Sequence, residues 1–464
     1  MNSLFATIFL PLIGAFSIPF VSKRYKSKVA VWILGATFIF SLVTVFALFK
    51  NKQLFFSGYF TDWFSFSFLG DGLGVFMAVV SSFVGFLIAV YSLEYMKHYS
   101  ETGPFYFWMV LFMGAMMGLV FSNNIMLLFC FWEVSSVCSW ALIGFGRQEK
   151  DLKAADKAFL ITFFGASLML IGIIFIYLNY GTLEISSLRG MCLFNSVAFL
   201  LFAGIASKSA QLPFETWLPD AGVAPTPVTA LLHAAVLVKI GIFVFARFFA
   251  MTFVTSPFFL NTTIILSVIT IIVGAGSALV ENNIKRILAY STISQLGYIL
   301  LALALNTDIS FKVALIYILA HSLAKAGLFL CAGIIEQKTG TKDINELGGL
   351  IKFMPKTALA YLLCAFSIIG IPPFLGFWPK LMVVLLAIRA GHIAAGCFAV
   401  AGAVFTLFYL LRLFNKVFLG EVKSPAEEGR NSLMAAVVLI LGVLSLLLGI
   451  GFKLPFNFVS SIIR

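Results

Sequence analysis

The stretch that decides the fold runs from residue 206 to residue 241 and reads ASKSAQLPFETWLPDAGVAPTPVTALLHAAVLVKIG. It begins inside an apolar segment, so Lys208 is expected at membrane depth, and Pro213 follows five residues later. A proline inside a helix removes one backbone hydrogen bond and clashes with the carbonyl four residues back. A second apolar run then carries His233 and Lys239. Ionisable side chains beside a broken helix are typical of ion pathways, and this stretch therefore predicts one.

The composition is that of an all-α integral membrane protein, because 61% of the 464 residues are hydrophobic and only 11% are charged. The apolar runs divide into about fourteen transmembrane helices of roughly 20 residues each. No hydrophilic stretch is long enough for an extramembrane domain, so residues 1–464 are expected to form a single transmembrane domain. The six cysteines lack metal-ligand spacing, and we expect neither a metal site nor a bound cofactor.

The net charge of +12 does not indicate nucleic-acid binding, because the basic residues follow membrane topology. With the loop Lys23–Lys28 in the cytoplasm, 19 of the 31 Lys and Arg residues fall on the cytoplasmic side and 8 on the other. This asymmetry predicts a multi-pass protein of the cell membrane with both termini on the outer side. The remaining four lie within apolar spans: Lys208, Lys239, Lys325 and Lys380.

Buried lysines need partners. Each costs about 2.5–3.5 kcal/mol near the bilayer centre, so four without partners would cost about 10–14 kcal/mol. Glu133, in the run FWEVSS, is the one carboxylate expected inside a regular span. Pairing with a lysine would keep it ionised; the alternative is a protonated side chain bonded to a backbone carbonyl.

Two histidines accompany the lysines. His233 and Lys239 are six residues apart, about 120° around a helix, so water or another helix must join them. His321 and Lys325 are spaced i,i+4 and share one helix face. A lone buried histidine is usually a satisfied core residue, but the nearby lysines favour a proton relay.

A second broken helix repeats the first. Gly370–Pro373 interrupts an apolar segment, and Lys380 follows. Broken helices 7 and 12 lie five spans apart and face opposite ways, which suggests two inverted five-helix repeats. Lys208 precedes the proline of its break, whereas Lys380 follows the two prolines of its own, so these two lysines are not strict counterparts. The expected organisation is peripheral helices 1–3 (1–104), a first repeat of helices 4–8 (105–250), a second of helices 9–13 (260–420) and a last helix (430–464).

The sequence resembles the antiporter-like membrane subunits shared by respiratory complex I (NADH:quinone oxidoreductase), group 4 membrane-bound hydrogenases and multisubunit Na+/H+ antiporters. The runs that carry the resemblance are KSAQLPFETWLPDAGVAPTPVTALLHAAVLVKIG from 208, FWEVSSVCSWALIGF at 131–145, IKRILAYSTISQLGY at 284–298, LAHSLAKAGLFL at 319–330 and GIPPFLGFWPK at 370–380.

The resemblance implies fourteen helices with two inverted repeats, each forming a half-channel. It also implies that Glu133 pairs with Lys208, that Lys239 and Lys325 form a central relay with the flanking histidines His233 and His321, and that Lys380 is the terminal exchange residue. The expected function is translocation of protons or sodium ions by a non-redox subunit of a larger membrane complex. Its partners would be other membrane subunits, including homologous antiporter-like ones, while redox chemistry would lie in other chains of an oxidoreductase.

Two alternatives stay open from the sequence. The first is a passive structural subunit whose ionisable residues have no transport role. The second is a stand-alone secondary transporter for a small solute.

Overall fold

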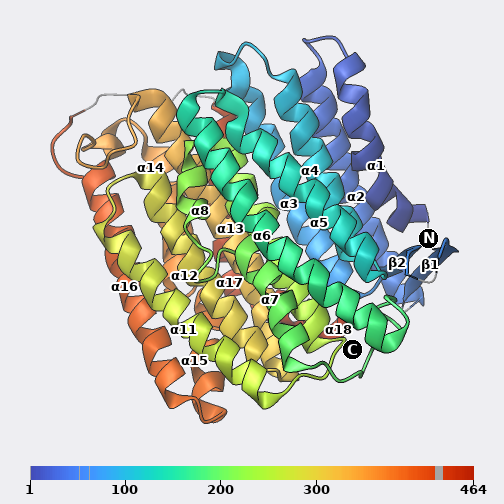
Figure 1. The fold of residues 1–464 in the computed structure, drawn as a ribbon. Helices are drawn as coiled ribbons and strands as arrows, with labels where there is room; N and C mark the ends of the chain where they lie inside the picture. Colours follow the sequence, from blue (N-terminus) through green and yellow to red (C-terminus); the bar gives the residue numbers. More distant parts are fainter. Residues whose placement is uncertain (1, 52, 62, 424–431, 464) are drawn as a thin grey trace.

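The computed structural model describes residues 2–51, 53–61, 63–423 and 432–463 as a bundle of helices with one small hairpin (Figure 1). Lys52, Arg430 and Arg464, which the charge count includes, lie outside the described residues. The α-helices are α1 Asn2–Ser17, α2 Lys26–Asn51, α3 Gly72–Tyr95, α4 Gly103–Phe121, α5 Ile125–Ile143, α6 Glu149–Tyr180, α7 Asn195–Lys208, α8 Trp217–Asp220, α9 Thr226–Ala230, α10 Leu237–Phe245, α11 Pro257–Val280, α12 Ile284–Ala304, α13 Asp308–Thr339, α14 Pro355–Ile369, α15 Phe377–Arg389, α16 Ile393–Phe418, α17 Leu433–Ile450 and α18 Lys453–Ile462.

Twelve helical segments in the described chain are long and apolar enough to span a membrane, and α7 and α14 are shorter apolar helices. The prediction of an all-helical, multi-pass membrane protein is confirmed. The most apolar 18-residue stretch of Thr226–Ala250 is completely buried, whereas that of α6 is 39% buried. The ionisable residues of the second apolar run therefore lie at the centre of the bundle.

Helix α3 differs from its expected place in a peripheral layer. It is mostly buried and packs against α13 and α17 as well as α2 and α4. Its interior position comes from apolar packing, which charge patterns in the sequence do not reveal.

Two parts of the bundle are built alike. The Asn124 side chain caps α5 by accepting hydrogen bonds from two backbone N–H groups, and Asn283 caps α12 in the same way. Asn124 forms an isolated antiparallel bridge with Glu184, and Asn283 forms one with Asp343. Each residue of the second bridge lies 159 residues after the matching residue of the first bridge. Helix α13 likewise begins and ends 159 residues after α6.

The end of the bundle where α5 begins carries a β-hairpin, with β1 Leu54–Tyr59 antiparallel to β2 Ser65–Gly70. Asp71 follows β2 and caps α3, and Arg247 donates two hydrogen bonds to the Asp71 carboxylate. This buried ion pair connects the hairpin to the end of Thr226–Ala250, called here the central segment. Both chain termini lie toward this end (Figure 1).

The opposite end, called here the basic face, carries the connections α3–α4, α5–α6, α11–α12 and α13–α14. Asp220 accepts hydrogen bonds from Lys157 and Arg286, each at 2.6 Å, and so joins α6, α8 and α12. In the structure it lines a small cavity of about 380 Å³ and is ion-paired.

Candidate functional site

The break after α7 positions the first buried lysine. Helix α7 ends at Lys208, and residues 209–216 form an irregular segment that contains Pro213. The sequence predicted freed carbonyls near this point. The Trp217 indole donates a 2.9 Å hydrogen bond to the Ser207 carbonyl, so one of them is satisfied by a side chain from beyond the break.

Lys208 is fully buried and bonds to α5. Its Nζ donates to the Trp132 carbonyl at 2.8 Å and to the Ser136 hydroxyl at 2.6 Å, and it lies 4.8 Å from the centre of the Trp132 ring. Both acceptors are neutral. Lys208 is therefore held in place without a direct counter-charge.

The direct Glu133–Lys208 contact implied by the resemblance is not present in the described chain, where no ion pair within 4.0 Å joins the two. The Glu133 carboxylate still interacts electrostatically with Lys208. Glu133 is partly exposed, while its neighbour Trp132 faces the interior, because adjacent helix residues point about 100° apart. One carboxylate oxygen of Glu133 is buried without a hydrogen-bond partner among the described residues.

Lys239 and His321 meet at the centre. The Lys239 Nζ lies 2.6 Å from the Nδ1 of His321, and both side chains are buried. Helices α10 and α13 supply them, so a second helix brings an imidazole to Lys239, but this imidazole is that of His321 and not that of His233. His321 was expected to reach Lys325 on its own helix; instead Lys325 donates to the Leu288 carbonyl at 3.1 Å.

His233 lies in a π-helical turn, η5 Leu231–Ala235, between α9 and α10. Its ring stacks on Phe329 of α13 with centroids 4.3 Å apart. Both ring nitrogens are buried without a hydrogen-bond partner in the described part of the chain. π-turns inside helices are frequent at functional sites. Sequence composition gave no signal for this one.

Lys380 lies just past the second break, between α14 and α15. Its Nζ donates to the Ile368 and Ile369 carbonyls at 2.6 and 3.2 Å, at the end of α14. It lies 5.1 Å from the centre of the Tyr298 ring on α12. The break thus binds this lysine through its own freed carbonyls.

The seven predicted site residues are called here the central row: Glu133, Lys208, His233, Lys239, His321, Lys325 and Lys380. Glu133 and Lys208 interact electrostatically with each other. His321 interacts electrostatically with His233 and with the lysines at 239, 325 and 380. Helix α7 packs against α10, and α13 packs against α15 and against η5, the turn that leads into α10.

Several polar atoms along the row have no protein partner within the described residues: Glu133 Oε1, Gln211 Oε1, His233 Nδ1 and Nε2, and His321 Nε2. Buried polar atoms in proteins nearly always have a partner, and where the protein supplies none, water does. Five such atoms along one row are therefore typical of a hydrated interior.

Sequence reasoning missed a second ionised cluster near the basic face. Glu336 on α13 lies 2.7 Å from Lys285 and 2.9 Å from Lys342. The charge count placed both lysines on the cytoplasmic side and gave them no buried partner, although the Lys285 side chain is buried. Lys285 is the second residue of α12, after the cap residue Asn283.

Comparison with known proteins gives two family matches. Residues 122–406 match the family described as NADH:quinone oxidoreductase/Mrp antiporter, TM, and residues 60–106 match NADH-Ubiquinone oxidoreductase (complex I), chain 5 N-terminus. A Na(+)/H(+) antiporter subunit of Bacillus subtilis (strain 168) is 34% identical over 486 residues, which cover 96% of this chain and 60% of that protein. A Na(+)/H(+) antiporter subunit of Staphylococcus saprophyticus is 32% identical over 96% of this chain and 61% of that protein.

Among solved structures, a chain of the Mrp complex from Dietzia sp. DQ12-45-1b matches with a TM-score of 0.91, 25% identity and coverage of 100% of this chain and 97% of that one. A chain of the membrane-bound sulfane sulfur reductase, an archaeal respiratory membrane complex, shares the fold with a TM-score of 0.90, 24% identity and coverage of 99% and 96%. The chain spans about 60% of the length of the two curated relatives named above.

Proposed function

Because the chain belongs to the NADH:quinone oxidoreductase/Mrp antiporter family of membrane subunits, we propose that it is an ion-translocating, antiporter-like subunit of a multisubunit membrane complex. Ions would move along the central row. The observation that carries this proposal is the 2.6 Å contact between Lys239 and His321, two titratable groups buried at the middle of the bundle.

The bonding of the lysines supports proton exchange. Lys208, Lys325 and Lys380 donate to backbone carbonyls or a hydroxyl, and Lys239 contacts an imidazole. A buried amine with neutral acceptors is charged or neutral according to nearby charges. Glu133, moving towards Lys208, would hold a proton there; moving away, it would release that proton along the row towards Lys239.

Repulsion between neighbours drives the transfer in this scheme. Like charges in a low-dielectric interior repel strongly, so each proton gained by one lysine makes its neighbour less able to keep its own. Water at the unpartnered atoms of His233 and His321 would bridge the gaps. The proton is the ion best matched to this chemistry, because Na+, a hard cation, prefers oxygen ligands and the row presents mostly nitrogen.

Partners and orientation follow from the relatives. The similar proteins are named as subunits of Na+/H+ antiporters, and the similar structures are multisubunit complexes. We propose other membrane subunits as partners, homologous antiporter-like ones included, with any redox chemistry in other chains. The basic face would lie in the cytoplasm and both termini outside the cell membrane, as the positive-inside rule favours.

The proposed architecture has fourteen membrane helices with inverted repeats at 105–250 and 260–420. Two observations support it: the recurrence of the Asn124–Glu184 bridge as Asn283–Asp343, and the opposite ends of the bundle at which the two bridges lie. Each repeat would supply one half-channel that opens to one side of the membrane.

The test replaces Lys208 or Lys325 by Gln in the complete protein, assembled with its partner subunits in vesicles. Proton translocation per assembled complex should fall about tenfold or more, since a positioned proton-transfer group contributes at least this much. Lys153→Gln is the matched control, because Lys153 pairs with Glu149 on the exposed surface and should tolerate the change. Normal translocation in the Lys208 and Lys325 variants would refute the proposal. Lower assembly with an unchanged rate of translocation per assembled complex would favour a passive structural subunit. Solute flux by the isolated chain in liposomes would instead indicate a stand-alone transporter.

A further inference from the structure

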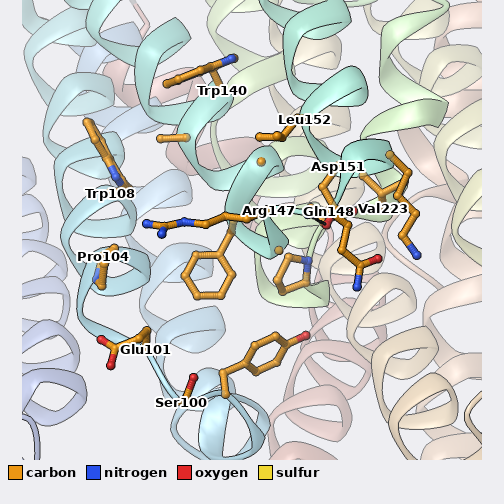
Figure 2. Close-up of a pocket in the computed structure, with 18 of the residues that line it drawn as sticks. Ser100, Glu101, Pro104, Trp108, Trp140, Arg147, Gln148, Asp151, Leu152 and Val223 are labelled. Carbon is orange, nitrogen blue, oxygen red and sulfur yellow. Dashed lines mark hydrogen bonds between the residues drawn. The ribbon is translucent and has the colours of Figure 1, made fainter.

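A large cavity opens on the basic face. It has a volume of about 1040 Å³ and is bounded by the α3–α4 and α5–α6 connections and by the segment before α9. Figure 2 shows Arg147 extended across it below Trp140 and beside Trp108. Glu336 and Lys342 also line it, as do Tyr95 and Tyr99. A space of this size admits many water molecules to the edge of the bundle.

Glu336 is the acid at the inner wall of this cavity. Its carboxylate lies between Lys285, which is almost fully buried, and Lys342, which is about one third exposed. Lys285 is further bound to the Ala224 carbonyl at 3.0 Å. The Thr226 hydroxyl donates a long 3.4 Å hydrogen bond to Glu336, so the carboxylate also contacts the start of the central segment that leads to His233.

A column of tyrosines runs inward from the same wall. Tyr91 and Tyr95 lie on α3, and Tyr99 follows four residues after Tyr95, just beyond the helix. The stacked rings are 5.7 Å apart for Tyr91 and Tyr95 and 6.3 Å apart for Tyr95 and Tyr99. The Tyr95 hydroxyl donates to the Thr226 hydroxyl, and the Tyr91 hydroxyl, fully buried, donates to the Leu330 carbonyl at 3.0 Å. Leu330 is the residue after Phe329, on which His233 stacks. The tyrosine hydroxyls therefore extend from the cavity towards His233, spaced about one helix turn apart.

The repeated architecture supplies an internal control for a purely structural role. The Asn283–Asp343 bridge has its counterpart 159 residues earlier, but the positions that match Lys285, Glu336 and Lys342 hold Met126, Tyr177 and Leu183. The first bridge forms without an ionised triad. The triad is therefore an addition to one half of the molecule, beyond what the shared fold requires.

We propose that Glu336 is the inlet acid through which protons pass from this cavity to the central row. The inference rests on the function proposed above. The carboxylate takes one proton from cavity water and becomes a carboxylic acid. It then gives that proton to the Thr226 and Tyr95 hydroxyls, each of which accepts one proton while releasing its own.

The proton continues along the Tyr91 hydroxyl and bridging water to a ring nitrogen of His233, and Glu336 returns to its ionised form. No group is consumed, and one proton is moved. Lys285 and Lys342 act as positioning residues that hold the carboxylate ionised between transfers.

The test compares variants that separate charge from packing. Glu336→Gln alone would leave Lys285 as a buried charge without its partner, so the decisive variant is the double Glu336→Gln/Lys285→Gln, with Lys285→Gln as its reference. Proton translocation per assembled complex should fall about tenfold in the double variant relative to Lys285→Gln. Glu336→Asp should restore part of the rate, because it keeps an acid. A double variant within twofold of its reference would overturn the proposal.

A second pair of variants decides the question should the double variant fail to assemble. Tyr91→Phe removes only the hydroxyl of the column and should slow translocation severalfold. Tyr361→Phe is the matched control, since the buried Tyr361 also donates to a backbone carbonyl at 3.0 Å but lies outside the column. Equal rates in these two variants would overturn the relay. Normal translocation by the Lys325→Gln protein would instead overturn the proposed function itself, so the two failures are distinguishable.

Discussion

At the residue scale, the buried cations fall into two groups with different partners. Lys208, Lys325 and Lys380 donate to neutral oxygen atoms, whereas Arg247 and Lys285 face carboxylates. An ion pair favours the charged form of both members, while a neutral acceptor lets an amine change charge more readily. The first group is therefore suited to proton exchange and the second to holding the fold or a single acid in place.

The contact between His321 and Lys239 yields a stability prediction. His321→Leu keeps most of the volume but removes the acceptor of a buried amine, which costs about 1–3 kcal/mol when it loses its partner. We expect a lower unfolding temperature of the purified protein and a loss of proton translocation. His392→Leu is the control, because His392 is only partly buried, in the connection before α16. An unchanged unfolding temperature in the His321 variant would contradict the contact between the two side chains.

Asp220 yields a prediction about pH. Partial burial raises the pKa of its carboxyl, but hydrogen bonds and charge from Lys157 and Arg286 outweigh this, and the pKa is lowered from its usual value. A lowered pKa stabilises the folded state above the unfolded value of about 3.9, and this contribution is lost as the pH falls through the folded pKa.

Asp220→Asn should accordingly lower stability by about 1 kcal/mol at neutral pH, with the difference from wild type shrinking below about pH 4. Thermal unfolding followed from pH 7 to pH 3 measures this. A difference that grows on acidification would show that the ion pairs with Lys157 and Arg286 do not form.

The residues of the central row were predicted from sequence, because a lysine inside an apolar span stands out by its cost alone. Their partners were not. Lys239 and His321 are 82 residues apart, and the spacing rules for helices relate only residues of the same helix. The hydrogen-bond acceptors of Lys208, Trp132 and Ser136 on α5, were likewise not predicted, and Glu133 acts on Lys208 only electrostatically.

At the element scale, prolines and glycines in the sequence predicted both broken helices, and the structure has a break after α7 and another after α14. The π-turn around His233 was not predicted, because its signal lies in backbone geometry and not in residue type. The β1–β2 hairpin was also not predicted. The alternation of serine and phenylalanine from Ser65 to Phe68 fits a strand.

The second break depends on a close backbone approach that can be tested. A Cβ atom added at Gly376 would lie 1.9 Å from the Ser367 carbonyl oxygen, whereas one added at Gly276 in α11 would meet open space. Gly376→Ala should therefore destabilise the protein by about 1–3 kcal/mol and displace Lys380. Gly276→Ala should be neutral or stabilising by up to about 1 kcal/mol. Thermal unfolding of both variants measures this difference in stability. Equal stability of the two would contradict the tight packing at the break.

At the scale of the whole molecule, the central row is buried in the bundle, and Glu336 lines a cavity on the basic face. The proposed proton path through the interior would explain why the most buried helices carry the ionisable residues. It also accounts for the irregular backbone at α7, η5 and α14, which is tolerated in a membrane only inside protein or beside water.

Hydration of the row is the central claim, and a density map of the complete complex in lipid, at a resolution that shows ordered water, tests it most directly. We expect water within about 3 Å of the ring nitrogens of His233, of His321 Nε2 and of Gln211 Oε1, in a chain that links Lys208 to Lys380. Side chains packed against those atoms, with no water between the lysines, would contradict the account.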